Sequence, residues 1–424
     1  MRISAIRPCD ANHTGHSAGG AVITSLALAI VAFASCATAK TKAQNIESVV
    51  ARVSERLGKQ PLAIGPVSGE LHKFRMVTAK GASRDLGRAM GMIGIEVGAP
   101  FPEVSAQHRE NNAATIALYR EIYPAYVERV AGIAEAYGRR LEDLDLAFIE
   151  GQYVWRMWEA TYGMVSPAKQ IPFPSCSGIG VQSSDGRTVV GRNLDDINRT
   201  YFLVRSEVEG CYKSMSASLA AFHEYPLDGM NEKGLFVGEM TIGDPTYAGN
   251  LWPDYPQRPS VYWLHMIRVV LDTCASVEQA VALFKRVPVW FSNELWHFFV
   301  ADRSGDFAVI EWGKDRQLSV TRQKGGVLIS MNTALMEGRE SLMKDWRYAY
   351  ADKYVAEHGA DGIATHASMA ELMKRVSIRE DNPVVPADVI GNRATVWTST
   401  YDLMERTMVI RYWEDRYKEH RLAF

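Results

Sequence analysis

The sequence predicts an α+β protein with a helix-rich N-terminal segment and a C-terminal region of antiparallel strands. Three observations indicate this class. Apolar residues recur at helical spacing between about Ser48 and Tyr162. After Cys176 the pattern changes to short β runs separated by turn residues, and two helical stretches, Val261 to Leu271 and Val277 to Arg286, interrupt these runs. Strand runs, a helical pair and further strand runs are typical of layered α+β folds.

The first 39 residues have the pattern of a secretory signal peptide. Two arginines precede an apolar run from Ala21 to Ala34, and Ala37 to Ala39 forms a small-residue cleavage pattern. A lipoprotein with Cys36 lipidated and a retained membrane anchor are the two alternatives; the run is shorter than the ~20 apolar residues that a spanning helix needs. We therefore expect a periplasmic or secreted protein whose mature chain begins near Lys40 and has no membrane span.

In the N-terminal segment, the clearest helix surrounds Tyr126, Val130 and Ile133, which recur at helical spacing. Pro124 suits the first helical position and Gly138 suits a C-terminal stop. We interpret residues 40–175 as a helix-rich N-terminal, or pro, segment.

In the C-terminal region, three pairs of β runs are each joined by a turn signal, and each pair predicts a hairpin. The pairs are 178–182 with 187–191, 298–301 with 307–312, and 395–402 with 407–413. Antiparallel hairpins of this kind build a sheet from neighbouring segments of chain.

The composition excludes a globally basic surface for nucleic acid, because the formal net charge is −2. A small-molecule or protein partner is expected, and a homo-oligomer is possible. No Cys or His spacing suggests a metal site, and we expect no metal or organic cofactor.

Five cysteines are present, and two of them, Cys9 and Cys36, belong to the predicted signal peptide. The other three are Cys176, Cys211 and Cys274. Exported cysteines tend to pair, but three is an odd number, so at least one is unpaired or pairs with another chain. Taken alone, Cys176 is a structural thiol or a disulfide partner of Cys211.

The chemistry that the sequence suggests centres on Cys176, which lies between a proline loop and a β run. If the Ser175–Cys176 peptide bond breaks, the residue gains an α-amine with a pKa of ~7.7 to 8.0 beside its thiol. Nucleophile and base would then belong to one residue. The hairpin returns Arg192 and Asp195 towards Cys176, where Arg192 can lower the thiol pKa and Asp195 can hold the α-ammonium. A surface ion pair between Arg192 and Asp195 is the plainer reading.

Cys176 followed by Gly191-Arg192-Asn193-Leu194-Asp195 resembles the signature of the N-terminal nucleophile (Ntn) hydrolases of the choloylglycine hydrolase and penicillin (isopenicillin N) acyltransferase type. The segment 228–235, Asp-Gly-Met-Asn-Glu-Lys-Gly-Leu, is similar to a segment of that family, as are residues 396–402. The resemblance implies a four-layer αββα sandwich that starts at Cys176. It also implies cleavage of linear amides through a thioester acyl-enzyme.

Three further site residues are implied only by the resemblance. The position at which bile salt hydrolases carry an oxyanion-hole residue falls on Thr241, which would act through its main-chain N–H. Asn332 is expected to donate to the oxyanion through its amide, and Arg347 resembles a late arginine beside the active site. Each could also be an ordinary polar or packing residue.

From these observations we expect an exported hydrolase of the carbon–nitrogen bond in a small-molecule N-acyl amide. It would comprise a signal peptide (1–39), the N-terminal segment (40–175) and an Ntn-hydrolase domain (176–424). Autoproteolysis between Ser175 and Cys176 would leave the N-terminal fragment as a non-covalent partner. An acyltransferase with an amine acceptor and an unprocessed secreted binding protein of the same fold are the alternatives, and the N-acyl substrate is left open.

Overall fold

The computed structural model describes residues 45–66, 74–150, 175–196, 201–218, 225–243, 256–291, 296–386, 394–412 and 418–424. All of them belong to one compact unit, Ala43–Phe424. The predicted signal peptide, with Cys9 and Cys36, and the proline loop before Ser175 lie outside the described residues. Within these ranges, no helix combines the length and the apolar character that crossing a membrane requires.

Two large sheets form the centre of this unit. The first has nine strands in the order β1-β2-β5-β6-β7-β8-β11-β12-β13, and the second has six in the order β14-β3-β4-β15-β16-β17. Neighbouring strands are antiparallel in both sheets, except that β2 and β5 run parallel.

The strands of the nine-stranded sheet are β1 (Leu62–Pro66), β2 (Phe74–Gly81), β5 (Tyr201–Val208), β6 (Ser214–Ser218), β7 (Pro226–Asn231), β8 (Leu235–Thr241), β11 (Trp296–Asp302), β12 (Asp306–Trp312) and β13 (Leu318–Lys324). Those of the six-stranded sheet are β14 (Gly326–Ser330), β3 (Ser175–Gln182), β4 (Thr188–Asp196), β15 (Ala394–Asp402), β16 (Thr407–Tyr412) and β17 (Glu419–Ala423). A small parallel pair joins β9 (Val261–Tyr262) to β10 (Val289–Trp290).

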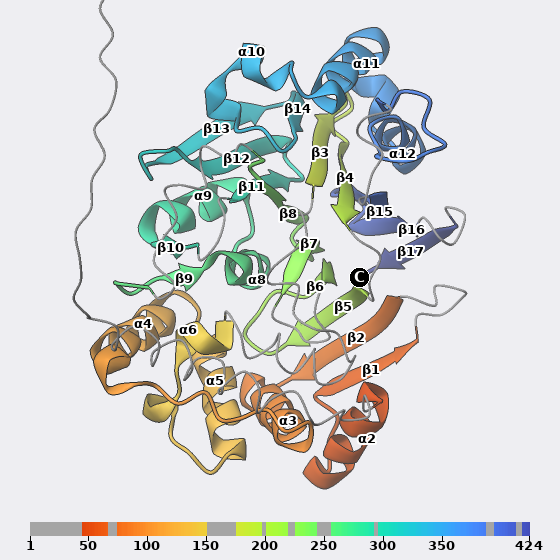
Figure 1. The fold of residues 1–424 in the computed structure, drawn as a ribbon. Helices are drawn as coiled ribbons and strands as arrows, with labels where there is room; N and C mark the ends of the chain where they lie inside the picture. Colours follow the sequence, from red (N-terminus) through yellow and green to blue (C-terminus); the bar gives the residue numbers. More distant parts are fainter. Residues whose placement is uncertain are drawn as a thin grey trace, which may run out of the picture. The chain divides into compact units, whose positions relative to one another are not determined.

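Helices cover the outer face of each sheet, which gives the four layers of an αββα sandwich (Figure 1). On the nine-stranded sheet, α8 (Trp263–Thr273) packs on β7 and β8, and α9 (Val277–Arg286) packs on β11 and β12. On the six-stranded sheet, α11 (Trp346–Ile363) packs on β3 and β14, and α12 (His366–Arg375) packs on β4 and β15. The expected fold class is therefore confirmed.

The two sheets approach closely where β3 faces the nine-stranded sheet. A Cβ on Gly180 of β3 would lie 2.7 Å from the ring of Phe307 on β12, so a larger residue at this position would push the sheets apart. This contact sets the depth at which the start of β3, and with it Cys176, lies between the sheets.

The N-terminal segment is mainly helical, as expected. Its helices are α2 (Ile46–Leu57), α3 (Ser83–Glu96), α4 (Arg109–Ile122), α5 (Pro124–Ala136) and the short α6 (Leu146–Phe148). Pro124 occupies the first turn of α5, and Gly138 ends that region with a φ of 66°. Short 3₁₀ helices lie at η1 (Ala106–His108), η2 (Leu141–Asp143) and η5 (Leu335–Glu337), the last beside α10 (Arg339–Leu342).

One feature of this segment differs from the sequence analysis, which did not predict the hairpin β1–β2. The hairpin extends the nine-stranded sheet, because β2 pairs with β5 in parallel from Phe74↔Tyr201 to Gly81↔Val208. Burial along β2 does not alternate regularly, because Phe74 and Val77 are buried and the two residues between them, Arg75 and Met76, are both half-buried. Without alternation the run lacks the period-two signal by which a strand is recognised.

Candidate functional site

The hairpin β3–β4 brings Cys176 and Arg192 to the same face of the six-stranded sheet. In the register of this pair, Cys176 lies opposite Leu194 and Gly178 lies opposite Arg192. Opposite residues of an antiparallel pair share a face, and successive residues alternate between faces. Cys176 and Arg192 therefore face the nine-stranded sheet, whereas Asp195 faces the helix layer.

Arg192 is in contact with the sulfur of Cys176. Its Nη2 lies 3.3 Å from Cys176 Sγ, and the same nitrogen donates to Glu239 O at 2.8 Å and to Glu239 Oε1 at 3.0 Å. Its Nη1 lies 3.0 Å from Asp228 Oδ2. Cys176, Asp228 and Glu239 are 0% exposed and Arg192 is 1% exposed, so the guanidinium is enclosed by two carboxyl groups and one thiol.

Arg347, in the first turn of α11, binds the backbone of Cys176 from the helix layer. Its Nη1 donates to Cys176 O at 3.2 Å and to Asp195 Oδ2 at 3.2 Å. Asp345, the N-cap of α11, accepts from Nε of Arg347 at 3.0 Å and from Nη2 at 2.7 Å. The cap and the ion pair together fix where the arginine points.

Asn332 joins Arg347 to the amide nitrogen of Cys176. Its Oδ1 accepts from Cys176 N at 2.8 Å and from Arg347 Nη2 at 2.9 Å, and its Nδ2 donates to Thr241 O at 2.7 Å. Two donors on one side and a carbonyl on the other fix the orientation of the side-chain amide. Thr241, at the end of β8, thus contributes a main-chain oxygen in the intact chain.

The six residues predicted from the sequence form one connected network. Asp195 is predicted to hold the α-ammonium of a cleaved Cys176; in the intact chain its carboxylate binds Arg347 and Thr395, and Asn332 Oδ1 receives the Cys176 N–H. Asn332 is predicted to donate to an oxyanion in turnover; in the intact chain its amide donates to Thr241 O.

Burial determines the ionisation of the groups in this network. It raises the pKa of Cys176 well above its ordinary value, and Glu239 and Asp195 add to this, although Arg192 and Arg347 act in the opposite direction. Arg192 therefore lowers the thiol pKa, as the sequence predicts, but burial outweighs its effect. Burial also raises the pKa of Asp195 to about 6 and that of Glu239 to about 8.

Two residues of the site, Asp228 and Glu239, were not predicted from the sequence. Asp228 opens a segment that matches the family but was given no role, and Glu239 was not singled out. Glu239 follows four apolar or glycine residues on β8, where an acidic side chain is unusual in a fully buried strand. An acidic residue in this apolar run was the signal by which Glu239 could have been recognised as a site residue.

The three cysteines among the described residues do not form disulfides. Cys176, Cys211 and Cys274 are all free, which excludes the alternative of a bond between Cys176 and Cys211. Burial raises the pKa of Cys211 to about 12 and that of Cys274 to about 11. In the part of the chain that the structure describes, no group of three His, Cys, Asp or Glu side chains is arranged to hold a metal ion.

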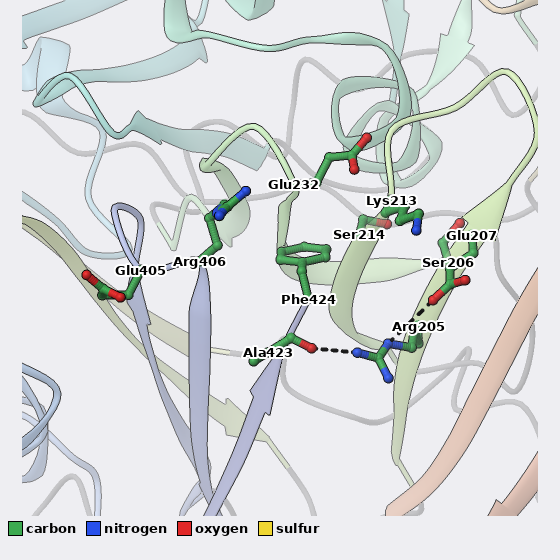
Figure 2. Close-up of a pocket in the computed structure, with 10 residues that line it drawn as sticks. All are labelled: Arg205, Ser206, Glu207, Lys213, Ser214, Glu232, Glu405, Arg406, Ala423 and Phe424. Atoms are coloured by element: carbon green, nitrogen blue, oxygen red, sulfur yellow. Dashed lines mark hydrogen bonds and ion pairs between the residues drawn. The ribbon is translucent and has the colours of Figure 1, made fainter.

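Two cavities lie among the described residues away from this network. One, of about 300 Å³, lies between β5, β6, the β15–β16 turn and β17, and Figure 2 shows its charged lining, in which Arg205 donates to Ala423 O. The other, of about 330 Å³, lies between β13, β14, η5, α10 and α11. Neither is lined by any of the six predicted residues.

The chain matches a family model described as acyl-coenzyme A:6-aminopenicillanic acid acyl-transferase over residues 181–416. It is similar to a bile salt hydrolase/transferase from Clostridium perfringens (strain 13 / Type A), with 26% identity over 202 residues. That alignment covers 42% of this chain and 57% of the relative, so the chain spans little more than half the length of this curated relative.

Two solved structures are also similar to the chain, at low identity. Penicillin V acylase from Agrobacterium tumefaciens shares 18% identity and a TM-score of 0.41 over 56% of this chain and 83% of its own. A mutant of the conjugated bile acid hydrolase from Clostridium perfringens shares 18% identity and a TM-score of 0.44 over 59% of this chain and 92% of its own.

Proposed function

The chain belongs to the acyl-coenzyme A:6-aminopenicillanic acid acyl-transferase family of choloylglycine hydrolase-like Ntn-hydrolases, and from this membership we propose that it cleaves the linear amide bond of an N-acyl substrate. The observation that carries the proposal is the pair of contacts at one residue. Arg192 lies 3.3 Å from the sulfur of Cys176, and Asn332 Oδ1 accepts from its nitrogen. An N-terminal nucleophile needs a cation at its sulfur and an acceptor at its nitrogen.

Cys176 becomes N-terminal, in this proposal, by self-cleavage of the Ser175–Cys176 bond. Its sulfur attacks the carbonyl carbon of Ser175, an S–C bond forms, the C–N bond breaks, and the nitrogen takes the thiol proton. Water then hydrolyses the thioester and leaves a free α-amine. In the intact chain Ser175 and Cys176 are the first two residues of β3. Complete burial of Cys176 and its raised pKa support a thiol that is unreactive towards substrate before cleavage.

After cleavage, the α-amine lies against Asn332 Oδ1, the acceptor that its amide precursor already uses. The amine accepts the thiol proton, and Arg192 stabilises the thiolate as it attacks the substrate carbonyl. We assign the oxyanion donors to the Asn332 amide and the main-chain N–H of Thr241. The amine returns its proton to the leaving nitrogen, and water cleaves the resulting thioester.

Arg347 and Asp195 position other groups of the site in this scheme. Arg347 binds Cys176 O and Asn332 Oδ1 at once, so it holds the nucleophile and the acceptor of its amine in register. Asp195 binds Arg347 and thereby fixes the guanidinium on the helix-layer side of β4.

A transferase is the second candidate, because both the family description and the printed name of the relative include transfer. An amine would then attack the thioester in place of water, and the same site would serve. The two activities differ only in the acceptor, so product analysis with an added amine distinguishes them.

Export and retention of the N-terminal fragment complete the proposal. Removal of residues 1–39 and secretion or periplasmic location follow from the signal-peptide pattern. Retention is supported by the pairing of β2 with β5 and by Arg129, buried in α5, whose Nη2 lies 4.0 Å from Asp272 Oδ2 of α8.

The experiment is a panel of N-acyl amides incubated with the purified protein, with mass analysis of both products and protein. We expect released amine, released acid and a transient acyl adduct on the peptide that begins at Cys176. Cys176→Ala should show neither turnover nor adduct. Cys211→Ala is the matched control, since it removes a free thiol elsewhere and should retain both.

Cleaved protein that turns over none of the panel and forms no adduct would contradict the amide hydrolase. A chain that stays uncut and binds N-acyl compounds without turnover would indicate the binding protein instead.

A further inference from the structure

One nitrogen of Arg192 serves two acidic groups. Nη2 lies 3.3 Å from Cys176 Sγ and 3.0 Å from Glu239 Oε1. Glu239 Oε2 has no hydrogen-bond partner among the described residues, so this guanidinium nitrogen is the donor on which the carboxyl group depends. A negative charge on either Cys176 or Glu239 therefore draws on the same N–H group.

Asp228 already neutralises the other side of Arg192. Its Oδ2 lies 3.0 Å from Arg192 Nη1, and its Oδ1 accepts from Tyr401 Oη on β15 at 2.5 Å. Burial raises the pKa of Asp228, whereas Arg192 and the hydrogen bond from Tyr401 act in the opposite direction. Because Asp228 occupies Nη1, Cys176 and Glu239 are left to share Nη2.

Among the residues that the structure describes, the groups around Glu239 include no second cation. β4 contributes Arg192 and Asp196, β7 contributes Asp228, and β3 contributes Cys176. The charged groups of α8, which packs on β8, contact other partners: His265 binds Tyr119, and Arg268 binds Ser214 and Asp272. On β11, which pairs with β8, His297 binds Glu311 and Met331 O.

We propose that Glu239 is a positioning residue that competes with the Cys176 thiolate for Arg192, so that ionisation of Glu239 disfavours formation of the nucleophile. The proposal rests on the proposed function in one respect, that the Cys176 thiolate is the attacking group. The pair first loses the proton of Glu239 to solvent, and loss of the thiol proton then leaves two negative charges on one guanidinium nitrogen.

This competition gives the pair of acids a two-step titration. The first step is ionisation of Glu239, whose pKa burial raises to about 8, near the pH at which enzymes work. Full ionisation of Cys176 follows only in a second step at higher pH. Replacing Glu239 by a neutral isostere removes the competitor and leaves a single, earlier ionisation.

The test is titration of the thiolate by its ultraviolet absorbance, taken as the difference between a protein with Cys176 and the same protein with Cys176→Ala. The difference removes the contributions of Cys211 and Cys274. In Glu239→Gln we expect the midpoint of thiolate formation to fall by at least about one pH unit, a tenfold change in the ionisation constant. Glu239→Asp retains the charge and should keep the higher midpoint of the wild type.

Equal midpoints in wild type and Glu239→Gln would overturn the proposal, as would an equal fall in Glu239→Asp, which would indicate packing instead of charge. If Glu239→Gln does not fold, Glu239→Ala takes its place: a midpoint of thiolate formation below that of the wild type supports the competition, and an equal midpoint contradicts it. The titration requires neither cleavage nor turnover, so failure of the amide hydrolase, read from products, is distinguishable from failure of this inference.

Discussion

At the scale of residues, the site depends on a buried guanidinium that binds three groups at once. Arginine suits this place because its planar fork presents several donors in fixed directions, which a lysine ammonium does not. Arg192 reaches Cys176, Asp228 and Glu239 from one position on β4. Loss of its charge would leave the two buried carboxyl groups without their cation.

We predict that Arg192→Met lowers the free energy of unfolding by about 3 to 5 kcal/mol, the usual effect of removing one partner of a buried ion pair. Arg322→Met is the matched control, because Arg322 pairs with Asp306 and Glu278 at the surface, 39% exposed, and should change stability by less than about 1 kcal/mol. Urea unfolding of both variants in a Cys176→Ala background measures the difference. Equal losses in the two variants would contradict the account.

The buried carboxyl groups also predict how stability depends on pH. The pKa of Asp195 is raised from 3.8 to about 6 and that of Glu239 from 4.5 to about 8, in both cases by burial. The folded chain thus binds their protons more tightly than the unfolded chain does. Their contribution is fully present below about pH 4 and is lost as the pH rises through about 6 and then about 8. A folded pKa that lies one pH unit above the unfolded pKa corresponds to about 1.4 kcal/mol of this contribution.

The free energy of unfolding of the uncut Cys176→Ala protein, measured from about pH 5 to about pH 9, checks this dependence, because both groups titrate in that range. We expect the unfolding free energy to fall with rising pH, and to fall less in a protein that also carries Glu239→Gln. Stability that rises across this range, or an unchanged slope in the double variant, would show that Glu239 is ionised throughout.

At the scale of elements, the N-terminal segment depends on a close crossing of α3 and α5. A Cβ on Gly87 of α3 would lie 1.8 Å from Arg129 O, and one on Gly132 of α5 would lie 2.1 Å from Arg84 O. The two helix backbones are therefore in direct contact. Arg129, which this crossing positions, is also the residue that reaches Asp272 of α8.

We predict that Gly87→Ala destabilises the protein by about 1 to 3 kcal/mol, because the helices must separate, even though alanine favours a helix over glycine by ~1 kcal/mol. Gly65→Ala on β1 is the matched control, since a Cβ there meets nothing within 4 Å. Thermal unfolding of the two variants checks the prediction. A Gly87→Ala protein as stable as the wild type would mean that the two helices do not cross this closely.

The elements also show what the sequence could and could not predict. The hairpin β3–β4 and the helix α5 were predicted because Ser184 to Gly186 mark a turn and Pro124 and Gly138 mark helix ends. The face of the sheet on which Asp195 lies was not predicted. A shift of one residue in register moves every side chain to the opposite face, and spacing alone does not fix the register. The contact of Glu239 with Arg192 joins two sheets, and no local pattern encodes a contact between sheets.

At the scale of the whole molecule, the segment before Cys176 is an integral part of the fold. It provides two strands of the nine-stranded sheet and the helices that pack against α8 through buried polar contacts. Cutting the chain at one peptide bond would leave these contacts in place. We therefore expect the two fragments to elute together in native buffer and to separate only in denaturant.

The most direct measurement is the intact mass of the purified chain from residue 40, with and without Cys176→Ala, under native elution and after denaturation. The account predicts two co-eluting fragments in the wild type, the second beginning with Cys176, and one uncut chain in the variant. Cutting that persists in the variant, or an uncut wild type that turns over N-acyl amides, would show that the nucleophile is not released in this way.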